Sequence, residues 1–164
     1  RYNCAILEEG TVICWGDGSN GKLGDGYPGD NWIPEYVDTE DDIYRTSAGS
    51  EHSCAIDDQA MAICWGYGDD GQLGNDDTDS QSTPVEAQIS FNAGSTRTVI
   101  DISAGDSHSC AILDNGSVTD YISNYKLLLL NIQSPTSINT PSNLQKFYFN
   151  LQYIFPPRSG TITI

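Results

Sequence analysis

Four of the five cysteines occur as two pairs with the same spacing. Cys4 and Cys14, and again Cys54 and Cys64, lie ten residues apart, and each pair flanks a short run typical of a hairpin turn. Opposite positions on paired antiparallel strands bring Cβ atoms to roughly 4.5–5.5 Å, close to the separation of about 3.5–4.5 Å that a disulfide needs. The spacing therefore favours two cross-strand disulfides, although five reduced cysteines buried as small hydrophobic side chains also fit it.

The fifth cysteine, Cys110, has Asp120 at the position where the pattern requires a second cysteine, so we expect it to lack a disulfide. Disulfides persist in oxidising compartments, which predicts a secreted, periplasmic or cell-surface protein. Reduced cysteines would instead indicate the cytoplasm or nucleus. No zinc site is expected, because the sequence has no Cys-x-x-Cys pair and both histidines lie in a different segment.

His52 and His108 occupy the same place in two related segments. A histidine that recurs in a recurring turn is typical of a structural hydrogen-bonding role, and two such residues in separate units would lie too far apart for a catalytic dyad. The sequence contains no nucleophile elbow, phosphate-binding loop or metalloprotease motif either. We therefore expect no catalytic residue, no cofactor and no enzymatic activity.

The tryptophans divide into two kinds. Trp15 and Trp65 share one position in two related segments and are interpreted as core aromatic residues. Trp32 has no such counterpart, since Ser82 holds the matching position. Large aromatic side chains are common anchors of protein interfaces, so Trp32 is a candidate contact residue for a partner.

Two acidic, glycine-rich loops, residues 17–26 and 67–80, invite a calcium interpretation. Alternating oxygen ligands around a glycine suit this cation, and Asp76, Asp77 and Asp79 are the best candidates. Neither loop supplies the bidentate glutamate of an EF-hand, however. We therefore expect these loops to be solvated and assign them no metal.

These residues belong to a repeated unit. Residues 4–24 and 54–74 match at 11 of 21 positions, and residues 47–56 and 103–112 match at 8 of 10. The offsets of 50 and 56 residues are too long for most helical repeats and point to one propeller blade per unit. Each unit contains two apolar runs around a turn such as Glu8-Glu9-Gly10, in which glycine supplies the left-handed backbone of a three-residue hairpin loop. Both faces of this hairpin are apolar, so we expect neighbours on both sides.

Two motifs carry a family resemblance: Ser-Ala-Gly-x-x-His-Ser-Cys-Ala-Ile, and Cys-Trp-Gly-x-Gly-x-x-Gly-x-Leu-Gly. Over residues 1–119 the chain resembles the repeat of the regulator of chromosome condensation family, with cysteines as a departure from the family pattern. The resemblance implies an all-β fold, a partial β-propeller of two to three four-stranded blades from a seven-bladed ring, with the remaining blades outside this chain. The residues that match the structural signature of the repeat are Trp15, Gly16, Gly24, Gly49, His52, Trp65, Gly66, Gly74, Gly105 and His108.

The repeats predict a division of the chain into a truncated copy at 1–46, a complete copy at 47–102 and a truncated copy at 103–119. We interpret residues 120–164 as a non-repeat tail and keep three alternatives open: an aberrant reading frame, disorder, or a divergent segment packed on the last blade. Residues 121–133 are a candidate helix within it. Because Arg1 lies inside a repeat and no initiator methionine is present, we interpret the sequence as a fragment of a longer protein.

The charge is concentrated in the repeats. Residues 1–119 carry 22 acidic and four basic side chains, whereas the tail is slightly basic. A strongly acidic surface repels nucleic acid and attracts proteins with a basic surface. No apolar run is long enough to span a membrane.

We therefore expect a non-catalytic scaffold for protein–protein interaction, which binds an unidentified protein, with a basic surface, through the variable loops 26–44 and 76–98. The family resemblance offers a first alternative, guanine-nucleotide exchange on a small GTPase, for which no residue of this sequence can be matched. A propeller enzyme or lectin is the second alternative.

Overall fold

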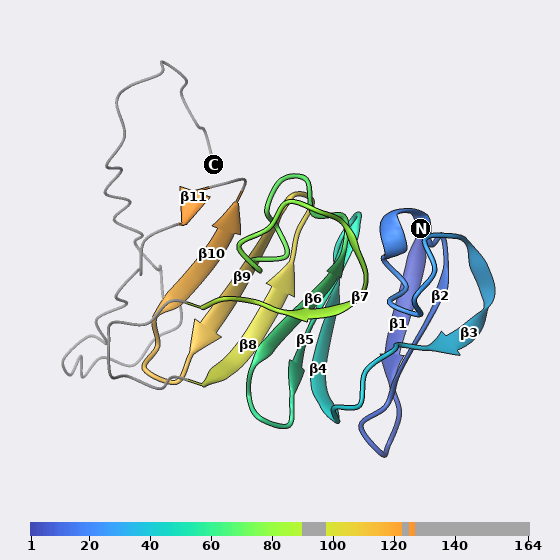
Figure 1. Cartoon of the computed structure of the whole chain (residues 1–164). Coiled ribbons are helices and arrows are strands. Elements are labelled where there is room, and N and C mark those ends of the chain that lie inside the picture. The colour runs from blue at the N-terminus through green and yellow to red at the C-terminus, as the bar shows by residue number, and fades with distance from the viewer. Residues whose placement is uncertain (90–97, 123–124, 127–164) are drawn as a thin grey trace, which may run out of the picture. The chain divides into compact units, whose positions relative to one another are not determined.

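In the computed structural model, the described residues are 1–89, 98–122 and 125–126, with side chains described up to Thr119. These residues form three antiparallel β-sheets and one short 3₁₀ helix, η1 (Ser19–Gly21) (Figure 1). The all-β prediction is therefore confirmed for this part of the chain.

The first sheet has three strands: β1 (Tyr2–Ile6), β2 (Val12–Gly16) and β3 (Asn31–Tyr36). The second has four, in the order β4 (Ile43–Ala48), β5 (His52–Asp57), β6 (Ala62–Gly66) and β7 (Gln81–Glu86). The third runs β8 (Val99–Ala104), β9 (His108–Leu113), β10 (Val118–Ile122) and β11 (Tyr125–Lys126). Strands β10 and β11 occupy part of the segment predicted as a helix at 121–133, so that prediction is wrong where the structure describes it; the remaining tail lies outside the described residues.

The hairpin register follows the cysteine spacing. Cys4 pairs with Cys14 across β1 and β2, and Cys54 pairs with Cys64 across β5 and β6. Each pair forms a disulfide, with Cα atoms 4.2 Å and 4.1 Å apart, so the predicted pairing is confirmed. In the third hairpin Asp120 lies opposite Cys110, and no cross-strand disulfide closes it.

The sheets do not coincide with the sequence copies. Strand β8 begins in the copy at 47–102, crosses into the next copy and pairs with β9 in the third sheet. Likewise, β4 begins in the copy at 1–46, ends in the next copy and pairs with β5 in the second sheet. One sequence unit therefore spans two neighbouring sheets, and its covalent continuity holds adjacent blades together.

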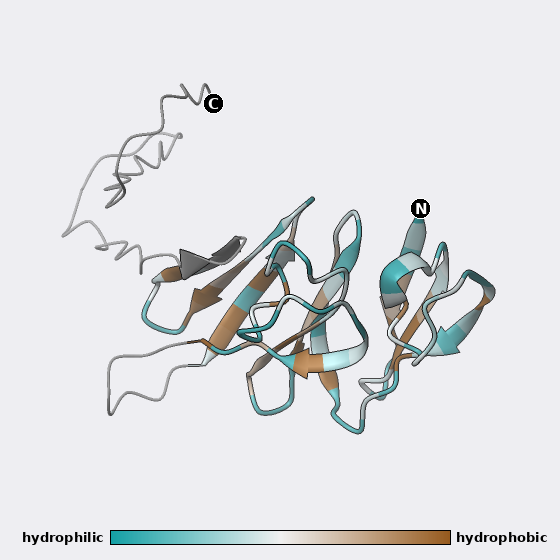
Figure 2. Cartoon of the chain, turned by 45° about the horizontal axis from the view of Figure 1, so that its top comes forward, coloured by the Kyte–Doolittle hydropathy of each residue, from teal (hydrophilic) through white to brown (hydrophobic). Residues whose placement is uncertain are grey.

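The second sheet is covered on both faces, as the apolar character of its hairpin predicts. One face, with the Cys54–Cys64 disulfide and Ile56, joins a core cluster with residues of the third sheet such as Leu113. The other face, with Ala55, Ile63 and Trp65, joins a second cluster with Val12 and Leu23 of the first unit. Hydrophobic residues accordingly concentrate on the strands and hydrophilic ones in the loops (Figure 2). Burial on both faces stabilises the blade by about 25 cal/mol per Å² of apolar surface.

Two glycines of the repeat signature are required by close packing. Gly66 has a φ of 106°, and a Cβ there would lie 2.8 Å from the His52 Cα. A Cβ on Gly24 would lie 2.6 Å from the Trp65 Nε1, so the indole packs directly against the backbone of the preceding unit. Any larger residue at either position would force the strand or the indole to move.

Candidate functional site

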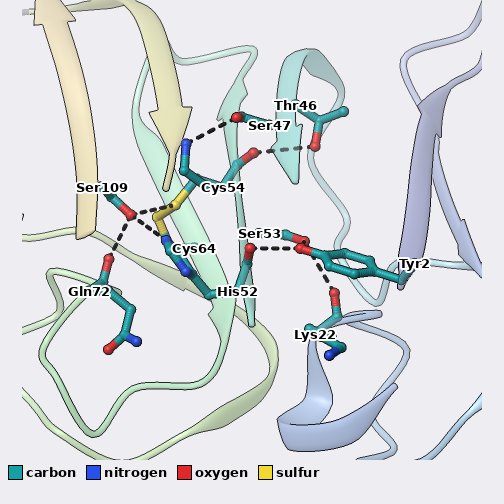
Figure 3. The surroundings of a disulfide bond; sticks show 11 residues. Tyr2, Lys22, Thr46, Ser47, His52, Ser53, Cys54, Cys64, Gln72 and Ser109 are labelled. Atoms are coloured by element: carbon teal, nitrogen blue, oxygen red, sulfur yellow. Dashed lines mark hydrogen bonds between the residues drawn. A yellow bond between two sulfur atoms is a disulfide. The ribbon is translucent and has the colours of Figure 1, made fainter. Parts of the chain in front are cut away.

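A polar seam recurs between neighbouring sheets (Figure 3). At the first boundary the Tyr2 hydroxyl donates to the His52 carbonyl oxygen at 2.6 Å and lies 2.8 Å from the Ser53 Oγ, which in turn donates to the Lys22 carbonyl oxygen at 3.2 Å. At the second boundary the same three positions are His52, Ser109 and Gln72. Each seam thus joins a strand, the next blade and a glycine-rich turn through one serine hydroxyl.

His52 is completely buried in the second seam. Its Nε2 lies 2.8 Å from the Ser109 Oγ, and that hydroxyl donates to the Gln72 carbonyl oxygen at 2.8 Å. A hydroxyl carries one proton, so Ser109 accepts from His52, whose Nε2 is the protonated ring nitrogen. The other nitrogen, Nδ1, is buried with no hydrogen-bond partner. Burial, helped by the charge of His108, lowers the pKa of His52 to about 4, so the ring is neutral near pH 7.

The charged side chain of Lys22 is buried in the first seam. Its Nζ lies 3.0 Å from the Asp17 Oδ2 and 3.0 Å from the Glu51 Oε2, and 5.6 Å from the centre of the Tyr2 ring. Burial alone would lower the pKa of Lys22, but hydrogen bonds to the two carboxylates outweigh it and raise that pKa. The Asp17 pKa is lowered, mainly by hydrogen bonds from Ser19 and then from Lys22.

The glycine-rich loops are therefore less solvated than expected. Residues 21–24 of the first loop and 72–74 of the second are buried, because each loop packs into the seam with the next blade. Gln72 replaces Lys22 in the second unit, and its Nε2 is buried with no hydrogen-bond partner. Sequence reasoning missed Lys22, Tyr2 and the two serines, although the 50-residue offset already aligned Tyr2 with His52.

A cavity of about 230 Å³ lies where the β3–β4 connection meets the β5–β6 turn. It has an apolar part and a charged part, and none of its lining residues is basic. The lining residues are Thr39, Asp41, Asp57, Gln59, Met61, Ile63, Pro84 and Glu86. The Asp57 carboxylate holds the turn, since its Oδ1 accepts from the backbone N–H groups of Gln59 at 2.9 Å and Met61 at 2.8 Å.

The calcium candidates serve the local backbone. Asp77 Oδ1 accepts from the N–H of Thr78 at 2.7 Å and from that of Asp79 at 3.4 Å, while Asp76 is exposed with a positive φ of 59°. Over the described ranges, no three histidine, cysteine, aspartate or glutamate side chains come together as a metal site. The three aspartates are therefore not gathered into one cluster in this part of the structure.

Trp32 is 73% exposed on β3. Its counterpart in the second sheet, Ser82, packs against the preceding unit: the Gly26 N–H donates to the Ser82 carbonyl oxygen at 3.0 Å, and Gly21 lies against the Ser82 backbone. In the second unit, the position that corresponds to Trp32 therefore lies against the preceding unit. The exposure of Trp32 does not identify a partner.

The remaining signature residues are distributed along the blade boundaries. Trp65 is fully buried and donates from Nε1 to the Lys22 carbonyl oxygen at 3.0 Å, whereas Trp15 is half-buried. His108 is exposed, in contrast to His52. Gly49 lies against the backbone of Gly105, whose carbonyl oxygen also accepts from the Ser50 N–H at 3.0 Å. The structure thus buries His52 and leaves His108 exposed but near enough for its charge to lower the His52 pKa, so the two histidines lie closer than the sequence predicts.

Two family models match the sequence of this chain. The model described as "Regulator of chromosome condensation (RCC1) repeat" matches residues 9–56 and 62–112, and a second model of the same description matches residues 43–72. The chain belongs to the RCC1 repeat family. Each match of the first model begins in one sheet and ends in the next, as the RCC1 repeats of this chain do in the structure.

Solved structures share the fold. Human WBSCR16 matches 73% of the RCC1-repeat chain with a TM-score of 0.62 and 16% identity. Yeast RCC1 (Prp20), in a crystal structure bound to Kap60, matches 73% with a TM-score of 0.61 and 21% identity. Prp20p from Saccharomyces cerevisiae, whose structure was described with its binding properties to Gsp1p and histones, matches 77% with a TM-score of 0.61 and 26% identity.

The chain spans about a third of those structures, covering 30%, 27% and 32% of their lengths. It is thus a segment of RCC1-type β-propeller, with three successive blade sheets in its described part. No curated protein sequence matches it. Within the described residues, no helix is long and apolar enough to cross a membrane.

Proposed function

We propose that this RCC1-repeat segment is part of a non-catalytic scaffold outside the cytoplasm, and that it binds a protein with a basic surface. The RCC1-like propeller fold supports a role in protein interaction or in nucleotide exchange. The choice of the scaffold rests chiefly on the acidic cavity between the β3–β4 connection and the β5–β6 turn.

This cavity suits a lysine or arginine side chain of a partner. Met61, Ile63 and Pro84 offer apolar contacts to an aliphatic stem, while Asp41 and Glu86 offer carboxylates to its charged end. The cavity volume of about 230 Å³ is large enough for one such side chain. Its lining comes from residues 39–41, in the β3–β4 connection, and from residues 84–86 at the end of β7. The predicted variable loops 26–44 and 76–98 therefore contain strands β3 and β7, and residues 90–97 lie outside the described part.

The rest of the charge pattern supports the same partner. The chain has a formal net charge of −16 and a sequence pI of about 4.1. A field of this sign accelerates association with a basic protein and weakens it as salt screens the charges. Nucleic acid is disfavoured for the same reason, because its phosphates would be repelled.

The compartment is proposed from the two disulfides. Cross-strand disulfides at the same place in two blades persist in an oxidising environment and would be reduced by cytoplasmic thiols. Secretion, the periplasm and the cell surface all meet this condition. Mapping of linked peptides without reduction, with thiols alkylated at harvest, tests it: labelling of all five cysteines would overturn the proposed compartment.

Nucleotide exchange remains the second candidate because the chain belongs to the family and matches Prp20p, a protein with described binding to Gsp1p. A fluorescent guanine nucleotide loaded on a small GTPase would be released faster by this protein if it were an exchange factor. No acceleration is expected under the scaffold proposal.

Binding to the cavity can be tested with a labelled peptide of alternating arginine and glycine, followed by fluorescence anisotropy at increasing salt. The double variant Asp41→Asn/Glu86→Gln should weaken binding about tenfold, which is about 1.4 kcal/mol. Asp57 is left unchanged because it holds the turn. Asp106→Asn, an exposed change between β8 and β9, is the matched control and should alter affinity less than about twofold.

Equal weakening by the cavity variant and the control would contradict a specific role for the cavity. A glutamate–glycine peptide of the same length should not bind. If it binds as tightly as the arginine peptide, the charge argument fails altogether.

A further inference from the structure

The third hairpin carries a feature that the first two lack. Its turn is Asn115-Gly116-Ser117, which is the sole Asn-x-Ser or Asn-x-Thr sequence without proline in the chain. This tripeptide is the acceptor motif for N-linked glycans in proteins that enter the secretory pathway. We propose that Asn115 is an N-glycosylation site, an inference that rests on the extracytoplasmic location proposed above.

Asn115 is exposed in the folded hairpin, as a residue that carries a glycan must be. Asn115 is exposed at the tip between β9 and β10, and Gly116 beside it has a φ of 78° with nothing within 4 Å of a built Cβ. A bulky, hydrophilic glycan therefore meets open space at this tip.

The position also tolerates a further blade. At the first two hairpin tips, the Gly10 and Ala60 carbonyl oxygens accept from the N–H groups of Ile43 and Val99, in the strand that starts the next sheet. Glu9 and Gln59, which precede those residues as Asn115 precedes Gly116, are nevertheless exposed. A glycan on Asn115 is thus compatible with continuation of the propeller beyond the third sheet.

Ser117 sets the timing of the modification. In the folded hairpin Ser117 is 1% exposed, and its Oγ donates to the Asn115 Oδ1 at 2.6 Å. A transferase that must read both side chains cannot reach this hydroxyl in the closed hairpin. The glycan is therefore attached to the chain before β9 and β10 pair, and the folded protein then displays it.

The sugar donor for this transfer is an oligosaccharide linked to a polyprenyl pyrophosphate. The Asn115 Nδ2 attacks the anomeric carbon of the first sugar and forms the new C–N bond. The bond from that carbon to the pyrophosphate oxygen breaks, and the pyrophosphate leaves with the electron pair. The amide nitrogen loses one proton to a base of the transferase, and no oxidation or reduction occurs.

The test is a glycopeptide map of the protein isolated from its natural source, digested with trypsin. Cleavage after Arg97 and Lys126 releases one peptide that holds Asn115. We expect this peptide to carry hexosamine, and peptide-N-glycosidase in heavy-oxygen water to convert Asn115 to a labelled aspartate. Spontaneous deamidation at Asn-Gly also takes its new oxygen from the water, so a parallel digest kept in heavy-oxygen water without the glycosidase gives the background to subtract.

Matched variants separate the modification from a role in the turn. Asn115→Asp keeps the Oδ1 acceptor of the turn but removes the nucleophilic nitrogen, so it should abolish the glycan and leave secretion and folding unchanged. Ser117→Thr keeps the motif and should keep the glycan. Loss of the glycan in Ser117→Thr together with retention in Asn115→Asp would place the sugar elsewhere and overturn the proposal.

The disulfides are mapped on the same sample so that two failures remain distinct. Linked Cys4–Cys14 and Cys54–Cys64 peptides with an unmodified Asn115 would overturn the glycosylation site and leave the proposed compartment standing. Reduced cysteines together with an unmodified Asn115 would overturn both.

Discussion

Acidification should destabilise the contact between the second and third sheets through His52. Burial lowers the pKa of this imidazole from its ordinary value of 6.5 to about 4. Between these two values the unfolded chain binds a proton that the folded chain does not. The contribution of His52 to the free energy of unfolding is therefore fully present above pH 6.5. It falls as the pH drops below that value and is lost below about pH 4.

The size of the effect follows from the two pKa values. Each unit of difference corresponds to about 1.36 kcal/mol, so the full loss at low pH is about 3 kcal/mol. Linkage places about 2 kcal/mol of this loss above pH 5. Small domains unfold with about 5–15 kcal/mol, so a loss of this size is readily measured.

The assay is urea denaturation followed by the fluorescence of the buried Trp65, at a series of pH values from about 7.5 to about 4.5. His52→Gln keeps an N–H group that can donate to the Ser109 hydroxyl but removes the titration. It should cost some stability near pH 7 and then lose about 2 kcal/mol less than the parent protein between pH 7 and pH 5. Carboxylates such as Asp17 titrate in both proteins and cancel in the difference.

His108→Gln is the matched control, since it removes the exposed histidine at the same repeat position. It should keep most of the acid dependence of the parent, because burial is the largest cause of the lowered His52 pKa and the charge of His108 is a smaller one. If His52→Gln and the parent lose stability in parallel, then the buried imidazole is not the cause and the argument from burial is refuted.

Three further predictions concern stability in the same assay. Cys54→Ser/Cys64→Ser should lower the free energy of unfolding by about 2–3 kcal/mol, as closing a loop of this length predicts, and a reductant should then have less effect than on the parent. Lys22→Gln, which installs the residue of the second unit, should cost about 1 kcal/mol, whereas Lys22→Glu should cost more than about 2 kcal/mol and recover with salt. Gly10→Ala should destabilise by about 1 kcal/mol because the backbone is left-handed there, and Ala60→Gly at the equivalent turn should stabilise by a smaller amount; equal signs would contradict this reasoning.

The cysteine hairpins show what a sequence can predict about local structure. The ten-residue spacing and the turn glycine fix which strand positions face each other, because both are set within a dozen residues of chain. The disulfides, the position of Asp120 opposite Cys110 and the two-sided burial of the second hairpin therefore followed from the pattern. The repeat length likewise predicted a propeller, since only a few architectures use units of this size.

Lys22 shows where this reasoning failed. A lysine in an acidic, glycine-rich loop has the composition of a solvated turn, and composition alone predicts one. The loop instead packs against the next blade, and burial of the ammonium is tolerated because Asp17 and Glu51 reach it from either side. Nothing within the loop itself encodes the approach of Glu51, which lies 29 residues further along the chain.

By itself, the sequence determined the unit: its hairpins, its disulfides, its family and its acidic charge. Only the tertiary structure decided which side chains meet between units, namely Tyr2 with Ser53 and His52 with Ser109, and where an acidic cavity opens. Those pairs are separated by 51 and 57 residues. The physical reason is that local spacing fixes strand register, whereas the angle and distance between two sheets depend on how their buried faces pack together.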